Sequence, residues 1–185
     1  MDVAVIGGRG FVGAAVVEEL AEEHAVTTID PGQGGADHIA ADVTDAEEIS
    51  AALDGFDAAV NLAGLSPVQE PRGVSYQAVH ADGARHVAAA CREHGTRLVH
   101  MSALGADPDA DTAYLRTKGE GREAVLDADI DATVVEPSII YDTGNELVEL
   151  VERLAPTRTF PHLRTRIQPV YRGDIAELFR MAVDG

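Results

Sequence analysis

A glycine-rich segment close to the start of the chain constrains the fold more than any other feature of the sequence. Gly7, Gly8, Gly10 and Gly13 follow a strand-like apolar run at residues 3–6, and a helix-like amphipathic pattern begins directly after them. Glycines at these intervals permit a tight turn and a close approach of helix to strand, which leaves the backbone N–H groups of the helix start open to a ligand. The segment therefore predicts a strand, a turn and a helix that together can bind an anion.

The alternation of short apolar runs and longer amphipathic runs continues along the chain and predicts an α/β fold. We expect strands at residues 3–6, 25–29, 38–41, 58–62, 97–101 and 132–136, and helices at residues 11–23, 45–53, 74–94, 112–128, 146–154 and 174–183. Several strand runs are apolar on both faces, as in parallel sheets that helices cover on both sides. The length and the pattern favour a single domain over residues 1–185.

An acidic residue at the end of the second expected strand indicates which ligand the glycine segment binds. Asp30 follows the glycines by about twenty residues, the position at which a carboxylate can accept hydrogen bonds from a dinucleotide ribose. The pattern predicts a Rossmann-like doubly wound sheet in the order 3-2-1-4-5-6 that binds NAD. Arg9 keeps NADP open as the alternative, because an arginine in the loop can hold the 2′-phosphate. Asp30 repels that phosphate, so NAD is the expected cofactor.

The only lysine of the chain, Lys118, follows Tyr114 by four positions. Residues four apart on a helix share one face. An ammonium group beside a phenol favours the phenolate and lowers the tyrosine pKa from its usual value of ~10. A tyrosine with such a neighbour can act as a general acid or base. Taken alone, the pair is equally consistent with a surface helix that carries both residues without a function.

The charge, the cysteine content and the apolar runs of the chain limit which ligands and which cellular location we expect. Lys+Arg is 14 and Asp+Glu is 32, so the formal net charge is −18, which disfavours nucleic acid and anionic membranes as ligands. Cys91 is the only cysteine, so a disulfide framework within the chain is excluded. We find neither a signal-peptide pattern nor an apolar run of the ~20 residues that a membrane span requires, and expect a cytoplasmic protein. The acid-rich, lysine-poor composition resembles that of proteins from salt-accumulating archaea.

In their order and intervals, these residues resemble the extended and atypical branches of the short-chain dehydrogenase/reductase superfamily, the NAD-dependent epimerases and dehydratases. The elements that carry the resemblance are the glycine segment with Asp30, an Asp-Val element at Asp42 and Val43, residues 61–64 at the end of the fourth strand, Ser102 with Tyr114 and Lys118, a proline turn at residues 136–141, and a late phrase at residues 168–176. Together they cover nearly the whole chain.

The resemblance implies a cofactor site and a reaction. The implied cofactor-binding residues are Gly7, Arg9, Gly10, Phe11, Val12, Gly13, Asp30, Asp42, Val43, Leu62, Ala63, Gly64, Lys118, Pro137 and Ser138. Tyr114 would exchange a proton with a substrate hydroxyl or carbonyl, Lys118 would bind the nicotinamide ribose, and Ser102 would hydrogen-bond the substrate oxygen. The implied protein is an NAD(P)-dependent oxidoreductase, epimerase or dehydratase that acts on a hydroxyl or keto carbon, with a nucleotide sugar as candidate substrate.

Three departures from the family pattern favour an alternative. A single serine ends the fifth strand, so Ala103 can occupy the register of the catalytic serine, and His80 stands where the family commonly has asparagine. Residues 143–166 are the candidate substrate-side segment, and they offer little room for a substrate lobe. Residues 99–106 and 116–120 are most similar to an atypical subgroup that includes the nucleotide-binding accessory subunit of respiratory complex I. The alternative is thus a nucleotide-binding accessory or regulatory protein with a degenerate catalytic site.

Two further groups of side chains, in the helix expected at residues 74–94 and in the irregular stretch after the sixth strand, are candidate ligands by residue type. Four side chains share the helix expected at residues 74–94 but lack a zinc-type spacing, so no metal site is expected; they are His80, His86, Cys91 and His94. Three arginines in the irregular stretch are candidates for the phosphates of a nucleotide sugar or for a solvated surface; they are Arg158, Arg164 and Arg166. By analogy with family dimers, the helices at residues 74–94 and 112–128 form a candidate homodimer interface.

Overall fold

A computed structural model describes residues 1–67, 73–143, 148, 153 and 168–185 and contains a six-stranded parallel sheet. The strands are β1 (Asp2–Ile6), β2 (Ala25–Asp30), β3 (His38–Ala40), β4 (Ala58–Asn61), β5 (Arg97–Met101) and β6 (Ala132–Val135). Their spatial order is β3-β2-β1-β4-β5-β6, which confirms the predicted order. The direction of strand order reverses between β1 and β4, the position at which such sheets bind ligands beyond their carboxyl ends.

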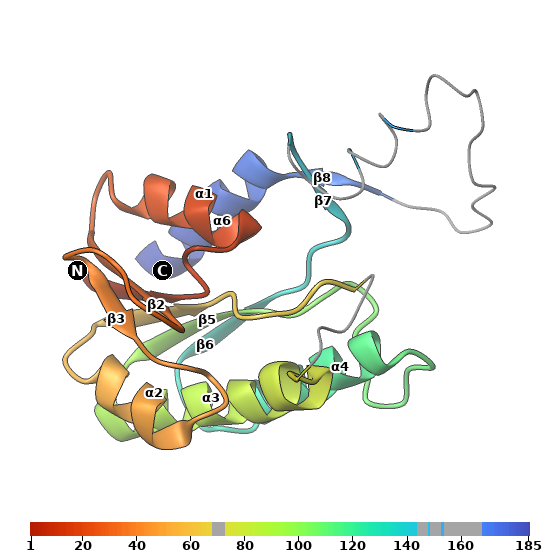
Figure 1. Cartoon of the computed structure of the whole chain (residues 1–185), viewed down its shortest axis with the longest axis horizontal. Helices are drawn as coiled ribbons and strands as arrows, with labels where there is room; N and C mark the ends of the chain where they lie inside the picture. Colours follow the sequence, from red (N-terminus) through yellow and green to blue (C-terminus); the bar gives the residue numbers. More distant parts are fainter. Residues whose placement is uncertain (68–72, 144–147, 149–152, 154–167) are drawn as a thin grey trace.

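Helices cover both faces of the sheet (Figure 1). On one face lie α1 (Phe11–Leu20) and α6 (Arg172–Asp184); on the other lie α2 (Ala46–Leu53), the π-helical turn η1 (Gln77–Asp82), α3 (Gly83–His94) and α4 (Ala113–Leu126). The sequence predicts one continuous helix at residues 74–94. The structure instead has η1 leading into α3, and π-helical turns of this kind are frequent at functional sites.

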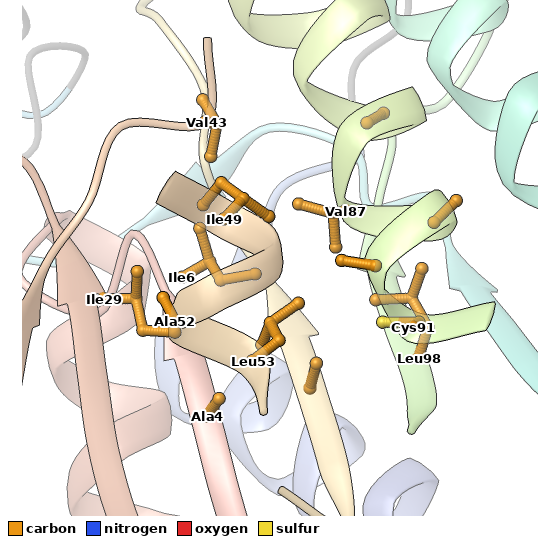
Figure 2. Close-up of a cluster of buried hydrophobic side chains, with 14 of the residues drawn as sticks. Ala4, Ile6, Ile29, Val43, Ile49, Ala52, Leu53, Val87, Cys91 and Leu98 are labelled. Atoms are coloured by element: carbon orange, nitrogen blue, oxygen red, sulfur yellow. The ribbon is translucent and has the colours of Figure 1, made fainter. Parts of the chain in front are cut away.

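Two apolar clusters form the core, one on each face of the sheet. Alternate residues of β1 supply both: Ala4 and Ile6 pack with Leu98 under α2 and α3, whereas Val3 and Val5 pack under α1 and α6. This two-sided burial explains the continuous apolar strand runs in the sequence. Figure 2 shows the first cluster, where ten labelled side chains from β1, β2, β5, α2, α3 and the residue 43 loop interlock.

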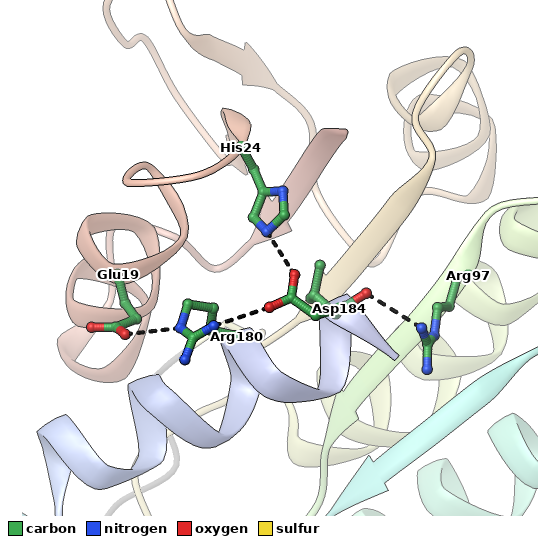
Figure 3. A network of polar contacts seen from close by, with 6 residues as sticks. Glu19, His24, Arg97, Arg180 and Asp184 are labelled. Carbon is green, nitrogen blue, oxygen red and sulfur yellow. Dashed lines mark hydrogen bonds and ion pairs between the residues drawn. The ribbon is translucent and has the colours of Figure 1, made fainter.

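Polar contacts fix α6 across the face it covers (Figure 3). Arg180 donates to Glu19 of α1 at 3.1 Å and to Asp184 at 3.0 Å, and the Asp184 carboxylate also lies 3.1 Å from the His24 ring nitrogen Nε2. Arg97, at the start of β5, donates to the Val183 carbonyl oxygen at 3.3 Å. These contacts hold the C-terminal end of α6 near the amino ends of β2 and β5.

A small second sheet was not expected from the sequence. Strands β7 (Ile140–Tyr141) and β8 (Val170–Tyr171) pair in parallel beside the start of α6. Three predicted features lie wholly or almost wholly outside the described residues: the helix predicted at residues 146–154, of which only residues 148 and 153 are described, the three arginines of the irregular stretch, and nearly all of the candidate substrate-side segment. Within the described part of the chain, no helix is both long enough and apolar enough to cross a membrane.

Candidate nucleotide-binding and catalytic site

The glycine turn lies against the ends of three neighbouring strands. Gly7 has a φ of +79°, which glycine adopts readily and other residues rarely do. A Cβ atom at Gly7 would lie 2.9 Å from the backbone nitrogen of Ala63, and a Cβ at Gly13 would overlap the Gly7 carbonyl oxygen. The Gly7 N–H donates to the Ile29 carbonyl oxygen at 3.0 Å. Side chains are therefore excluded from both positions, and the backbone is left to face a ligand.

The start of α1 has the properties of an anion site. Gly10 is the N-cap residue, no side chain caps the helix, and its first turn contains no acid. The first N–H groups of a helix lack partners within that helix, and its dipole places a partial positive charge at this end. Phe11 and Val12 are partly buried beside these groups. The pyrophosphate of a dinucleotide fits this arrangement.

Asp30 and Arg9 meet at the end of β2, as the sequence predicts. The Arg9 backbone N–H donates to the Asp30 carboxylate at 3.3 Å. Partial burial raises the pKa of Asp30, while the Arg9 N–H and the charges of His38 and Arg9 oppose that rise. The Arg9 guanidinium donates to the Gln33 carbonyl oxygen at 3.0 Å. The backbone contact keeps the carboxylate beside the glycine turn, and the side-chain contact ties the guanidinium to the loop after β2.

The predicted adenine contacts, Asp42 and Val43, are fixed by local bonds. The Asp42 carboxylate accepts from the backbone N–H and the hydroxyl of Thr44, both at 2.9 Å. Val43 is 7 % exposed and belongs to the core cluster under α2 and α3, where it lies opposite Gly83. The side chain of Val43 is thus mostly inside the protein, and its role toward adenine stays a prediction.

The segment after β4 connects the glycine turn to Lys118. The Leu62 N–H donates to the Ile6 carbonyl oxygen at 2.8 Å, and a Cβ atom on Gly64 would lie 3.3 Å from the Lys118 ammonium nitrogen Nζ. Lys118 is 3 % exposed, and its Nζ donates to the Met101 carbonyl oxygen at 3.1 Å. Burial lowers the pKa of Lys118 to about 8. An ammonium group has three N–H donors, so the contact with Met101 leaves capacity for a ligand.

Tyr114 lies one helical turn before Lys118, but its environment differs from the sequence-based expectation. Its ring meets the rings of His80 and Tyr76 edge-on, with centroid distances of 5.3 Å and 5.8 Å. Burial, with a smaller contribution from Tyr76, raises the pKa of Tyr114 instead of lowering it. Among the described residues, no hydrogen bond joins the Tyr114 hydroxyl to Ser102 or Lys118. The tyrosine pKa is not lowered, because the Lys118 ammonium group donates to a backbone carbonyl and because burial disfavours the phenolate.

Ser102 and the proline turn lie at the exits of β5 and β6. Ser102 is 2 % exposed, and its hydroxyl donates to the Lys118 carbonyl oxygen at 3.2 Å. This bond ties β5 to α4 and uses the serine proton, while Ala103 occupies the next position. The Pro137 carbonyl oxygen accepts from the Leu104 N–H at 2.9 Å, and Ser138 is partly buried beside it. Ser102 as a substrate ligand stays a prediction.

Sequence reasoning missed one arginine that contacts the start of α1. Arg172 donates to the Phe11 carbonyl oxygen at 3.1 Å, lies 4.9 Å from the centre of the Phe11 ring, and pairs with Asp142 at 2.8 Å. A hydrogen bond from the Thr143 N–H, with a smaller contribution from the Arg172 charge, lowers the pKa of Asp142. Arg172 lies inside the C-terminal motif at residues 168–176 that resembles the family, but the motif did not indicate that the Arg172 side chain reaches α1.

Comparisons with known proteins agree with this geometry. A family model described as NAD(P)H-binding matches residues 7–179. The chain is 28% identical to subunit 9 of the NADH dehydrogenase 1 alpha subcomplex of Arabidopsis thaliana over 93% of this chain and 47% of that protein. It is 31% identical to dTDP-4-dehydrorhamnose reductase of Mycobacterium tuberculosis over 77% of this chain and 55% of that protein. The chain thus spans about half the length of these curated relatives.

A solved structure supports the fold. The Bordetella bronchiseptica enzyme WbmH, in complex with NAD⁺, superposes with a TM-score of 0.82 over 100% of this chain and 72% of that chain, at 18% identity. At this identity the likeness shows the fold alone. The expected Rossmann-like architecture is confirmed.

Proposed function

Because the chain belongs to the NAD(P)H-binding family, we propose that it is an NAD-dependent oxidoreductase of the short-chain dehydrogenase/reductase type. One observation carries the proposal. A continuous set of contacts runs from the glycine turn through residues 62–64 to the buried Lys118 ammonium group. Within the described part of the chain Lys118 has no carboxylate partner, and a buried ammonium in that state is costly. A ribose that accepts from its remaining N–H donors would reduce that cost and would place the nicotinamide near Tyr114.

The proposed chemistry assigns a proton transfer to Tyr114. A bound nicotinamide would supply or remove the hydride. In the reduction of a ketone, the carbonyl carbon gains that hydride and the carbonyl oxygen gains a proton from the Tyr114 hydroxyl, which yields an alcohol. The Tyr114 hydroxyl holds its proton near neutral pH, as an ordinary tyrosine with a pKa of ~10 does. Burial raises this pKa and so makes the hydroxyl a weaker acid than a free tyrosine.

Asp30 supports NAD over NADP as the cofactor. Its carboxylate lies at the end of β2 beside Arg9, where it would accept from ribose hydroxyls and repel a 2′-phosphate. Arg9 opposes this preference, but its guanidinium is bound to the Gln33 carbonyl. As substrate we propose a hydroxyl or keto carbon of a small molecule, with a nucleotide sugar favoured by the likeness to dTDP-4-dehydrorhamnose reductase.

Substitution of Tyr114 tests the catalytic proposal. The purified protein with NADH is assayed against a panel of keto sugars and quinones, and Tyr114→Phe is compared with the wild type under the same conditions. We expect turnover with a keto sugar and a loss of at least about 100-fold in kcat for Tyr114→Phe, the scale of general acid catalysis. NAD affinity should stay within about twofold, because the ring is kept. Unchanged turnover in this variant would refute the assigned role.

A second candidate function is a nucleotide-binding accessory protein without turnover. The observation that favours it is the Ser102 hydroxyl, which donates to the Lys118 carbonyl oxygen and is followed by Ala103. The likeness to subunit 9 of the NADH dehydrogenase 1 alpha subcomplex fits the same idea. Tight NADH binding with no oxidation by any member of the panel would favour this function over the first.

A further inference from the structure

We propose that His80 is a positioning residue that joins the segment after β4 to helix α4 and so fixes the nucleotide site. The proposal rests on the nucleotide-binding role assigned above to residues 62–64 and Lys118. It gives a function to the side chain that stands in place of the family's usual asparagine. The sequence presents that replacement only as a departure from the pattern, and none of the cofactor or catalytic roles described above uses it.

Two hydrogen bonds define the state of the His80 ring. Its Nε2 atom accepts from the Leu65 backbone N–H at 2.9 Å, so this nitrogen carries no proton. The proton therefore resides on Nδ1, which donates to the Thr117 hydroxyl oxygen at 3.1 Å. The Thr117 hydroxyl in turn donates to the Ala113 carbonyl oxygen at 2.9 Å, within α4. The neutral ring thus connects the segment after β4 directly to the helix that carries Tyr114 and Lys118.

Burial keeps this arrangement intact over the ordinary pH range. His80 is 2 % exposed, and burial, followed by the charges of Lys118 and His100, lowers its pKa to about 3. A doubly protonated ring would have no lone pair for the Leu65 N–H. Because the ring is neutral at neutral pH, the hydrogen bonds to Leu65 and to Thr117 exist together in the folded protein.

The surrounding packing places His80 against Tyr114, the candidate proton donor. Its ring meets Tyr114 edge-on and stacks on Tyr76 at 5.2 Å. Its own backbone approaches α4 so closely that a Cβ atom at Gly121 would overlap the His80 carbonyl oxygen. The position of Gly64 near the Lys118 Nζ atom thus depends on a ring that is held from both sides. Loss of the bridge would free the segment after β4 to move away from Lys118.

The bridge is tested by nucleotide affinity, which does not depend on turnover. Four variants are compared with the wild type: His80→Leu, Thr117→Val, Thr117→Ser and the double variant His80→Leu/Thr117→Val. Thr117→Val keeps the shape of threonine without its hydroxyl, and Thr117→Ser keeps the hydroxyl. His24→Asn is the matched control, because His24 is also a partly buried histidine that bonds another element but lies at the amino end of β2. NAD dissociation constants come from calorimetry, and unfolding temperatures are measured in parallel.

We expect NAD to bind about five- to tenfold more weakly to His80→Leu, as for one or two lost hydrogen bonds. Thr117→Val should reproduce most of this loss, Thr117→Ser should restore wild-type affinity, and the double variant should lose no more than His80→Leu alone. His24→Asn should lower the unfolding temperature and leave affinity unchanged. If His80→Leu fails to fold, the Thr117 pair decides the question.

The proposal is overturned if Thr117→Val, or a folded His80→Leu, binds NAD within about twofold of the wild type while its unfolding temperature falls as in the control. That result would assign the bridge to stability alone. If the wild type does not bind NAD at all, the proposed function has failed instead. Nitrogen NMR of the histidine rings then still tests whether His80 is neutral and protonated at Nδ1, and a different protonation state would overturn the bridge itself.

Discussion

At the scale of single residues, the sequence identified Tyr114 and Lys118 as the candidate catalytic pair but did not predict their electrostatics. The sequence predicted a helix at residues 112–128, and α4 does carry both Tyr114 and Lys118. The sequence could not show that the Lys118 ammonium donates to the Met101 carbonyl oxygen, or that burial raises the Tyr114 pKa. Burial and hydrogen-bond partners depend on elements distant in sequence, so a local pattern predicts the identity of such groups better than their pKa values.

The lowered pKa of Lys118 predicts a pH dependence of nucleotide binding. Its pKa is about 8 instead of 10.5, and the ribose hydroxyls would accept from the protonated form. NAD affinity should therefore be constant below pH ~7 and fall as the pH rises through ~8, by at most about tenfold per pH unit. Calorimetry across this range measures the fall.

Lys118→Met provides the control for the titration. This variant keeps the apolar stem without the charge, so it should bind NAD more weakly than the wild type and show no step near pH 8. A step of equal size in Lys118→Met would assign the titration to another group and would contradict a ribose contact through Lys118.

At the scale of elements, the strand-turn-helix unit formed by β1, the glycine turn and α1 was predictable because its signals are local. Its glycines are required by contacts that the structure displays, such as the overlap that a Cβ at Gly13 would have with the Gly7 carbonyl oxygen. The β7–β8 pair had no comparable signal. Its two strands, Ile140–Tyr141 and Val170–Tyr171, have two residues each and are far apart in the sequence. Two residues are too few to show the apolar alternation by which a strand is recognised in a sequence.

Gly13→Ala tests the turn as a unit. The added methyl group must displace the Gly7 carbonyl, so we expect the free energy of unfolding to fall by about 1–3 kcal/mol and NAD affinity to fall at least about tenfold as the phosphate-facing N–H groups move. Gly35→Ala is the control, because a Cβ at Gly35 meets nothing within 4 Å. Equal NAD affinity in the two variants would contradict the placement of the pyrophosphate at α1. Chemical denaturation and calorimetry supply both values.

At the scale of the whole molecule, the order of all six strands followed from the sequence because the glycine segment and Asp30 identified the doubly wound pattern, which has this strand order. The family followed from motif order in the same way, and the match over residues 7–179 confirms it. Contacts that close the fold over long distances were not predictable. Arg172 reaches Phe11 and Asp142, and His80 bridges Leu65 and Thr117, because such pairs meet only after the sheet has formed.

The net charge of −18 also acts at this scale. It opposes the approach of any anionic ligand, and salt weakens that opposition. NADP carries one more phosphate than NAD, so the overall charge of the protein and the Asp30 carboxylate act in the same direction. Both favour NAD, and the comparison of the two nucleotides is best made at a single, stated salt concentration.

Calorimetric titration of the purified chain with NAD and with NADP tests the central claim most directly. The account predicts saturable binding of NAD at a single site per chain, at least about tenfold tighter than NADP. Absence of saturable NAD binding would contradict the nucleotide site built from the glycine turn, Asp30 and Lys118. Binding of NADP at least about tenfold tighter than NAD would contradict the role given to Asp30 and would transfer the cofactor preference to Arg9.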